Sequence, residues 1–364
     1  MFESKKCVVY TALLLGFLTV TSCSPGETIT PQSPRQSTTI TPSVQTLTVM
    51  THDSFAISEE VKAAFEAENN AAIKFLKAGD AGIALNKAIL AKDAPLADVF
   101  FGVDNTFLSR ALEEDIFETY QSPLLVQIPD EFELDQDHRA LPVDFGDVCL
   151  NYDKTFFEDK GIAPPQNLED LLQPEYKSFL VVENPATSSP GLAFLLATIG
   201  HFGEGGYLDY WNGLVANDVL VVNDWEIAYY TEFSRWGGTR PIVVSYSSSP
   251  PFEVIFAEEP LDEPKTGVVV GEGSCFRQIE FAGILQGTKS RPLAEKWIDF
   301  MLSKRFQEDI PLQMFVFPVN PDAELDETFQ KFLAAPEQPA EVSPEGIAEN
   351  RETWIRQWTE AVIR

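Results

Sequence analysis

The sequence is short of basic residues. Its 364 residues include 26 Lys and Arg against 56 Asp and Glu, which gives a net charge of −30 and an isoelectric point near 4.3. Proteins that bind nucleic acid use Lys and Arg to neutralise phosphates, so this balance argues against a nucleic-acid partner. The acidic surface keeps a protein soluble and mildly favours cationic ligands.

Residues suited to catalysis are also scarce. The histidines are His52, His138 and His201, and none of them lies in a recognisable nucleophile motif. There is no Gly-x-Ser-x-Gly elbow, in which a serine is exposed for nucleophilic attack. We therefore expect a protein that is not an enzyme and that uses neither a metal ion nor a cofactor.

Of only four cysteines, two belong to an amino-terminal export signal. Lys5 and Lys6 precede an apolar run from Cys7 to Val20, which is short for a membrane span. The small residues before Cys23 resemble the lipobox of bacterial lipoproteins. Residues 1–23 are therefore predicted to be a lipoprotein signal peptide with Cys23 as the lipidated residue, and a plain cleaved signal peptide is the alternative.

The segment 24–45 is rich in Ser, Thr and Pro and poor in residues that could form a core, which predicts a flexible tether. No later run is long and apolar enough to cross a bilayer, so the body of the protein is predicted to lie outside the cytoplasm, anchored to the membrane by lipid. In that oxidising compartment the remaining pair, Cys149 and Cys275, is predicted to form a disulfide. Two buried free thiols are the alternative.

From Thr46 onward, strand and helix patterns alternate with Gly or Asp at the junctions, which predicts an α/β fold with a mainly parallel sheet. The segment Leu141–Asp153 holds two short strand candidates, interpreted as a crossing between two lobes. A second alternation follows, and strand-like segments near 267–270 and 278–285 return the chain to the first lobe. The expected division is lobe 1 at 46–145 and 275–364, and lobe 2 at 146–274.

Several loops at the carboxyl ends of predicted strands carry candidate ligand groups, because ligands of α/β sheets tend to bind at that edge. Asp80 precedes a helix and is also suited to capping it. Asn184–Gly191 places Ser189 and a proline at a helix start, where free N–H groups could hold an anion. Trp225 stands in the first turn of another helix, where core packing is an alternative, and Pro241–Phe252 joins a buried strand to a serine-rich turn.

The order of these motifs resembles the thiamine-binding proteins of bacterial ABC importers, over essentially Thr46 to Asn320. The most specific parts are the Thr-Ser-Ser-Pro-Gly turn and the Ser-Tyr-Ser-Ser-Ser-Pro turn. The motifs that carry the resemblance are Thr51–Phe55, Gly102–Asn105, Asn184–Gly191, Trp225, Ser245–Pro250 and Phe317–Val319.

The resemblance implies a two-lobed type II periplasmic-binding-protein fold with the ligand cleft between the lobes. It implies capture of thiamine or a thiamine phosphate, and delivery to a membrane permease driven by a cytoplasmic ATPase, with the binding protein expected to be a monomer. The ligand-binding positions that it implies are Asp80, Ala81, Ser188, Ser189, Trp225, Tyr246, Ser247, Ser248, Ser249, Pro250, Phe252 and Phe315, together with His52.

Some of these positions depart from the family pattern. His52 and Phe252 stand where relatives carry tyrosine, Phe315 stands where one carries tryptophan, and Ala81 replaces a glycine. Another small cation, a polyamine or a ferric ion, is therefore the alternative ligand. A polyamine would need several carboxylates in the cleft, and a ferric ion would need paired tyrosines; adjacent tyrosines occur at Tyr229 and Tyr230 but point in different directions on a helix.

Overall fold

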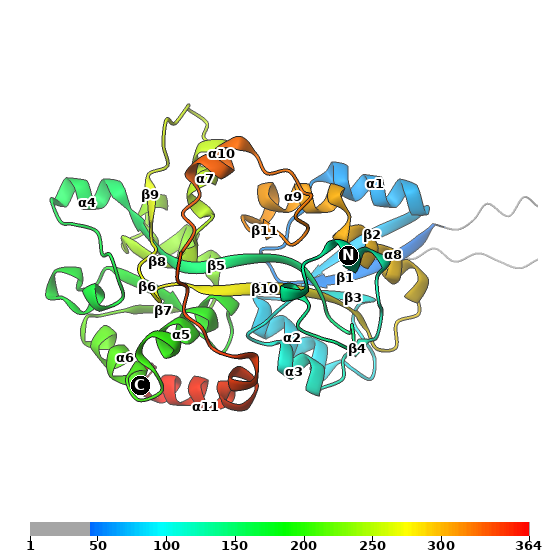
Figure 1. Ribbon diagram of the computed structural model, residues 1–364, viewed down its shortest axis with the longest axis horizontal. Coiled ribbons are helices and arrows are strands. Elements are labelled where there is room, and N and C mark those ends of the chain that lie inside the picture. The colour runs from blue at the N-terminus through cyan, green and yellow to red at the C-terminus, as the bar shows by residue number, and fades with distance from the viewer. Residues whose placement is uncertain (1–43, 364) are drawn as a thin grey trace, which may run out of the picture. The chain divides into compact units, whose positions relative to one another are not determined.

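The computed structural model describes residues 44–363, which fold around one mixed sheet (Figure 1). The predicted signal peptide, Cys23 and most of the predicted tether lie outside the described residues. In the described part the sheet order is β2-β1-β3-β10-β5-β8-β6-β7, with β4 on β10 and with β9 and β11 on β5. The strands are β1 Gln45–Thr51, β2 Ala71–Lys77, β3 Val99–Asp104, β4 Phe117–Glu118, β5 Leu141–Asp153, β6 Leu180–Glu183, β7 Leu220–Val222, β8 Ile242–Tyr246, β9 Thr266–Val269, β10 Phe276–Leu285 and β11 Phe317–Pro318.

Helices alternate with these strands as the sequence predicted, and several begin at a side-chain cap. Ser58 Oγ accepts a hydrogen bond from the amide of Val61 at the start of α1, and Ser343 Oγ accepts one from Gly346 at the start of α11. No helix within residues 44–363 is long and apolar enough to cross a membrane. The α-helices are α1 Glu59–Asn69, α2 Ala81–Leu90, α3 Leu108–Glu113, α4 Lys154–Lys160, α5 Ser189–Phe202, α6 Tyr207–Ala216, α7 Ser249–Ile255, α8 Arg291–Leu302, α9 Lys304–Met314, α10 Glu327–Phe332 and α11 Pro344–Val362, with a π-helical turn at Ile227–Glu232.

Two long antiparallel strands, β5 and β10, join the two ends of the sheet (Figure 1). At one end, the β1 end, β1 pairs in parallel with β2 and β3; at the other, the β6 end, β6 pairs in parallel with β7 and β8. Between them, β10 is antiparallel to β3 and to β5, and β5 is antiparallel to β8. The predicted parallel sheet is therefore confirmed at both ends, whereas the middle is antiparallel.

The strand β5 is continuous, so the prediction of two short strands in this segment was wrong. Its first part, Leu141–Val148, pairs with β10, and its last part, Val148–Asp153, pairs with β8 and β9. The two strand candidates were placed around Asp144-Phe145-Gly146, and the structure shows no break there. Pro142 lies where the β5–β10 register shifts, and a proline, which lacks an amide hydrogen, is tolerated at such an irregularity.

The predicted disulfide is confirmed. Cys149 on β5 and Cys275, just before β10, are bonded with Cα atoms 4.3 Å apart, and both are fully buried. The bond lies next to the last paired residues of the β5–β10 ladder, Val148 and Phe276. It therefore fastens together the two strands that join the ends of the sheet.

The carboxyl-terminal helix α11 packs on elements from both ends of the sheet. Its Trp358 meets Trp211 of α6 edge to face, with ring centroids 5.4 Å apart. Near the other end of α11, the buried Arg351 lies over the ring of Phe107, which precedes α3, at 5.6 Å. The helix thus touches α6, next to the β6 end, and α3, which follows β3.

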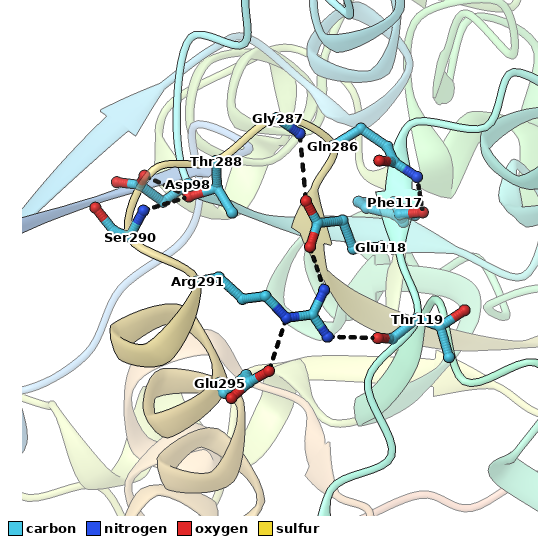
Figure 2. Close-up of polar contacts among 10 residues, drawn as sticks. All are labelled: Asp98, Phe117, Glu118, Thr119, Gln286, Gly287, Thr288, Ser290, Arg291 and Glu295. Carbon is cyan, nitrogen blue, oxygen red and sulfur yellow. Dashed lines mark hydrogen bonds and ion pairs between the residues drawn. The ribbon is translucent and has the colours of Figure 1, made fainter.

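A polar cluster fixes the start of α8 against β4 (Figure 2). Arg291 pairs with Glu118 of β4 and with Glu295 one helical turn later, and its guanidinium also donates to the carbonyl of Thr119 at 2.9 Å. The amide of Gly287 donates to Glu118 Oε1 at 3.3 Å. Because Arg291 is 42% exposed, its ion pairs contribute little free energy. Their main effect is to hold the turn between β10 and α8 in place.

Removing the disulfide should destabilise the protein strongly, because the bond closes a loop with a sequence separation of 126 residues. We expect the double variant Cys149→Ala/Cys275→Ala to lose about 3–5 kcal/mol of unfolding free energy, measured by urea denaturation. Reductant should produce a similar loss in the wild type and no further loss in the double variant. Equal urea midpoints for the wild type and the double variant would contradict this expectation.

Candidate functional site

A small cavity lies where the loops of both ends of the sheet meet. Its volume is about 40 Å³, well below the roughly 300 Å³ or more of pockets that enclose small ligands. A groove of about 380 Å³ adjoins it and shares Ser54, Asp80 and Trp225 with it. A ligand larger than a few water molecules therefore requires the two walls of the cavity to separate, one at the start of α2 and the other at Trp225. The lining residues are His52, Ser54, Asp80, Ala81, Ser189, Pro190, Trp225, Tyr246, Gln278, Glu280, Met314 and Val316.

About half of the ligand positions expected from the sequence line this cavity. They come from the end of β1, the start of α2, the start of α5, the segment before the π-helical turn, and the end of β8. Segments far apart in the sequence thus meet around one cavity, as expected for ligands that bind at the carboxyl ends of strands in α/β sheets. The expected residues that line the cavity are His52, Asp80, Ala81, Ser189, Trp225 and Tyr246.

Another group of expected residues lines a separate apolar groove of about 550 Å³. Ser249, Phe252 and Phe315 lie there, and the Phe252 and Phe315 ring centroids are only 3.8 Å apart. The ring of Tyr229 lines this groove and stacks on Trp225, with centroids 5.0 Å apart and planes inclined by 15°. The stacked pair therefore forms a wall between the groove and the cavity.

The other expected residues, Ser188, Ser247, Ser248 and Pro250, are buried but are not among the lining residues of either pocket. Ser248 donates its hydroxyl hydrogen to the carbonyl of Phe315, and the amide of Ser247 donates to the carbonyl of Asp147 at 2.8 Å. These contacts hold the serine-rich turn in place.

Asp80 connects the two walls of the cavity. It caps α2, since Oδ1 accepts a hydrogen bond from the amide of Ala81 at 2.8 Å, and Oδ2 accepts one from the amide of Trp225 at 3.3 Å. Beside it, the amide of Gly82 donates to the carbonyl of Thr187 at 3.1 Å. Burial raises the pKa of Asp80, and the hydrogen bonds offset part of that rise. The capping role considered for Asp80 is thus confirmed, and the residue also faces the cavity.

Local packing fixes the two aromatic faces of the cavity. Trp225 donates its indole N–H to Ser245 Oγ at 3.0 Å, which orients the ring beside β8. Tyr246 lies across Gly146 of β5, where an added Cβ would come within 2.7 Å of the Tyr246 ring. The Trp225 and Tyr246 ring centroids are 6.3 Å apart. A glycine in β5 therefore provides the space that the tyrosine ring occupies.

Three buried acidic residues of the site were not predicted. Glu280 lines the cavity, and in the sheet it lies opposite Asp104 of β3 on one side and Asp144 of β5 on the other. Burial raises the pKa of Asp104 to about 6 and raises that of Asp144 well above its ordinary value. An acidic residue in an otherwise apolar strand segment marks each of them singly in the sequence, but the pattern does not show that the three lie together.

His52 is the cationic group nearest to these acids. Its Nε2 lies 3.4 Å from Glu280 Oε1, and the side chain is almost fully buried. Burial alone would lower the pKa of His52, but the charge of Glu280 and the contact with it outweigh burial and raise the pKa. The site therefore combines aromatic faces with carboxylates and one histidine, a combination suited to a flat cationic ligand.

Comparisons with known proteins agree with this chemistry. The profile of the bacterial extracellular solute-binding protein family matches residues 94–334. The thiamine-binding periplasmic proteins of Salmonella typhimurium and Escherichia coli are 32% and 31% identical over 87% of this chain and 94% of their own length. A solved periplasmic thiamin binding protein superposes with a TM-score of 0.78 at 28% identity, covering 88% of this chain and 97% of that one.

The raised pKa of Asp104 predicts how stability changes with pH. The folded protein holds this proton more tightly than the unfolded chain, whose Asp pKa is about 4. The Asp104 contribution to stability is therefore fully present below pH ~4 and is lost as the pH rises through about 6. The side chain of Asp104→Asn does not ionise. The unfolding free energy of this variant minus that of the wild type should therefore be about 1 kcal/mol larger at pH 8 than at pH 5.

Urea denaturation at the two pH values measures this difference. The control Glu68→Gln removes an exposed carboxylate of α1 and should show no comparable change between pH 5 and pH 8. If Asp104→Asn and the wild type respond to pH in parallel, Asp104 does not carry a raised pKa in the folded protein.

Proposed function

The chain belongs to the family of bacterial extracellular solute-binding proteins, and we propose that it captures thiamine or a thiamine phosphate outside the cytoplasm and delivers it to an ABC transporter permease. Its fold is the two-lobed type II periplasmic-binding-protein fold, as expected. The observation that carries the proposal is the convergence of His52, Asp80, Trp225 and Tyr246 on one cavity.

The side chains of the cavity suit the chemistry of thiamine. The cationic thiazolium ring would be attracted to the faces of Trp225 and Tyr246, and the flat aminopyrimidine would stack on an aromatic ring. Asp80 would accept a hydrogen bond from the exocyclic amine. Within the described residues no side chain caps the start of α5, so its first N–H groups offer a place for a phosphate, next to Ser188 and Ser189.

The proposed mechanism is closure of two lobes on the ligand. We assign residues 46–145 and 275–364 to one lobe and 146–274 to the other, with the hinge in β5 and β10, the strands that join the ends of the sheet. The disulfide lies beside this hinge and would limit twisting of the two strands against each other. The closed form would then dock on the permease, which a cytoplasmic ATPase drives.

Capture without chemical conversion agrees with the surroundings of the serines. The hydroxyl of Ser248 donates to a backbone carbonyl, and Ser188 lies beside the carboxylate of Asp80. The relatives named above are binding proteins. Thiamine would therefore be cargo rather than a cofactor. We further propose that the protein acts as a monomer.

We further propose that the protein is tethered to the membrane by lipid on Cys23. The lipobox-like residues before Cys23 and the Ser/Thr/Pro-rich segment 24–45 support this arrangement. It would keep the binding domain close to the permease while allowing it to reorient.

Thiamine binding is tested by calorimetric titration. Trp225→Ala should weaken binding at least about 10-fold, because a desolvated cation–π contact contributes about 2 kcal/mol. Asp80→Ala should weaken it by a similar factor through the lost charge-assisted hydrogen bond. Trp236 lies in the apolar groove rather than the cavity. Trp236→Ala is therefore the matched aromatic control and should bind thiamine as the wild type does.

The same titration distinguishes the alternatives. If Trp236→Ala weakens binding and Trp225→Ala does not, the ligand occupies the apolar groove. If neither thiamine nor its phosphates bind to the wild type, the proposed function is wrong, and titration with a polyamine or with ferric ion tests the remaining cations.

Lipidation is tested by growing cells with a fatty-acid analogue and detecting label on the protein. The wild type and the control variant Cys7→Ala should incorporate the analogue, whereas Cys23→Ala should not, because the modified thiol is absent. Label that persists in Cys23→Ala would rule out the proposed anchor.

A further inference from the structure

Three carboxyl side chains lie in a row across the middle of the sheet, beneath the cavity. Glu280 of β10 is paired directly with Asp104 of β3 and with Asp144 of β5, so the three side chains share one face of the sheet. Each is at most 5% exposed. Like charges directly opposite each other on neighbouring strands are destabilising, so this row requires protons or a cation to balance it.

Both outer members of the row, Asp104 and Asp144, have raised pKa values. Neither oxygen of Asp144 receives a hydrogen bond from a donor group within residues 44–363, and its polar neighbour is the carboxylate of Glu280. Burial, followed by the charge of Glu280, raises the pKa of Asp144 well above its ordinary value. A protonated Asp144 can donate its O–H to Glu280.

Glu280 is also the member of the row that reaches the cavity. It lines the cavity with Gln278 from the same strand, and Tyr246 donates its O–H to Gln278 Oε1 at 3.4 Å. Among the lining residues, all within the described part of the chain, His52 is the only side chain that can carry a positive charge. Its Nε2 makes no hydrogen bond within residues 44–363, although Glu280 Oε1 is 3.4 Å away. His52 therefore balances the negative charge of the three carboxyl groups only in part.

We propose that Glu280 is a specificity-determining residue that contacts the cationic ring of the bound ligand. His52 is a cation already present in the cavity, and its charge repels the cationic ligand. This inference rests on the proposed function and concerns the same cavity. Opposite charges in contact attract more strongly in a partly desolvated cavity than in water, so Glu280 can favour a cation over a neutral ring of the same shape. The other charged groups that face His52 and Glu280 are Asp80, Lys77, Asp104 and Asp144.

The experiment compares two ligands of the same shape. Thiamine and a neutral isostere, in which an uncharged thiophene replaces the thiazolium ring, are titrated into the full folded protein at pH 6 by calorimetry. The wild type should bind thiamine at least 10-fold more tightly than the isostere. Glu280→Gln should weaken thiamine binding at least 10-fold and change binding of the isostere less than about 2-fold.

A second variant keeps the test informative if Glu280→Gln does not fold. His52→Gln removes the resident cation, whose raised pKa keeps it protonated at pH 6, so thiamine binding should tighten about 3-fold or more while isostere binding stays unchanged. The control Asp299→Asn removes a half-buried carboxylate of α8 outside the cavity and should preserve the preference of the wild type.

The outcomes separate this inference from the proposed function. Wild type that binds both ligands equally, or a Glu280→Gln variant that loses both ligands to the same extent, would overturn the role of Glu280 while leaving thiamine capture in place. An unchanged ligand preference in both Glu280→Gln and His52→Gln would also overturn it. If the wild type binds neither ligand, both the role and the function fail.

Discussion

The pairing of β5 with β10 is the constraint on which the rest of the structure depends. These strands are the connection between two parallel sheets that would otherwise be separate, and each carries partners on both sides. A change in their register by one residue would turn Glu280 and Asp144 to the opposite face of the sheet. The disulfide beside the last paired residues fastens the two strands at that register. The composition of the cavity therefore follows from strand pairing as much as from the loops.

This pairing explains why the site can hold buried charge. A carboxylate in a strand interior normally costs more free energy than a nearby partner returns. Here the acidic residues lie on neighbouring strands, so a protonated Asp144 can donate a hydrogen bond to Glu280, and His52 offsets part of the negative charge. The aromatic faces of Trp225 and Tyr246 then complete a site that favours positive charge.

The sequence predicted those parts of the fold and site that depend on local signals. The alternation of strands and helices could be predicted because Gly, Asp, Ser and Pro at junctions have local structural meaning. The disulfide could be predicted because Cys149 and Cys275 are the two cysteines left outside the export signal. The cavity positions were expected from the loops at strand ends and from the family resemblance. The acid row could not be predicted, because Asp104, Asp144 and Glu280 are brought together only by pairing between distant strands. The separation of Phe252 and Phe315 from the cavity depends on a stacked pair, Tyr229 and Trp225, whose orientation no sequence pattern records.

Asp80 divides its two oxygens between the amide of Ala81, on its own helix, and the amide of Trp225, on the opposite wall. Separating the walls breaks only the second of these bonds and exposes that oxygen to water. Closing them again strips the water away and leaves a buried acid with a raised pKa. In the proposed opening and closure, the hydration of a single carboxylate would thus change with the distance between the walls, and its proton affinity, observable as a titration, would report how far the protein is open.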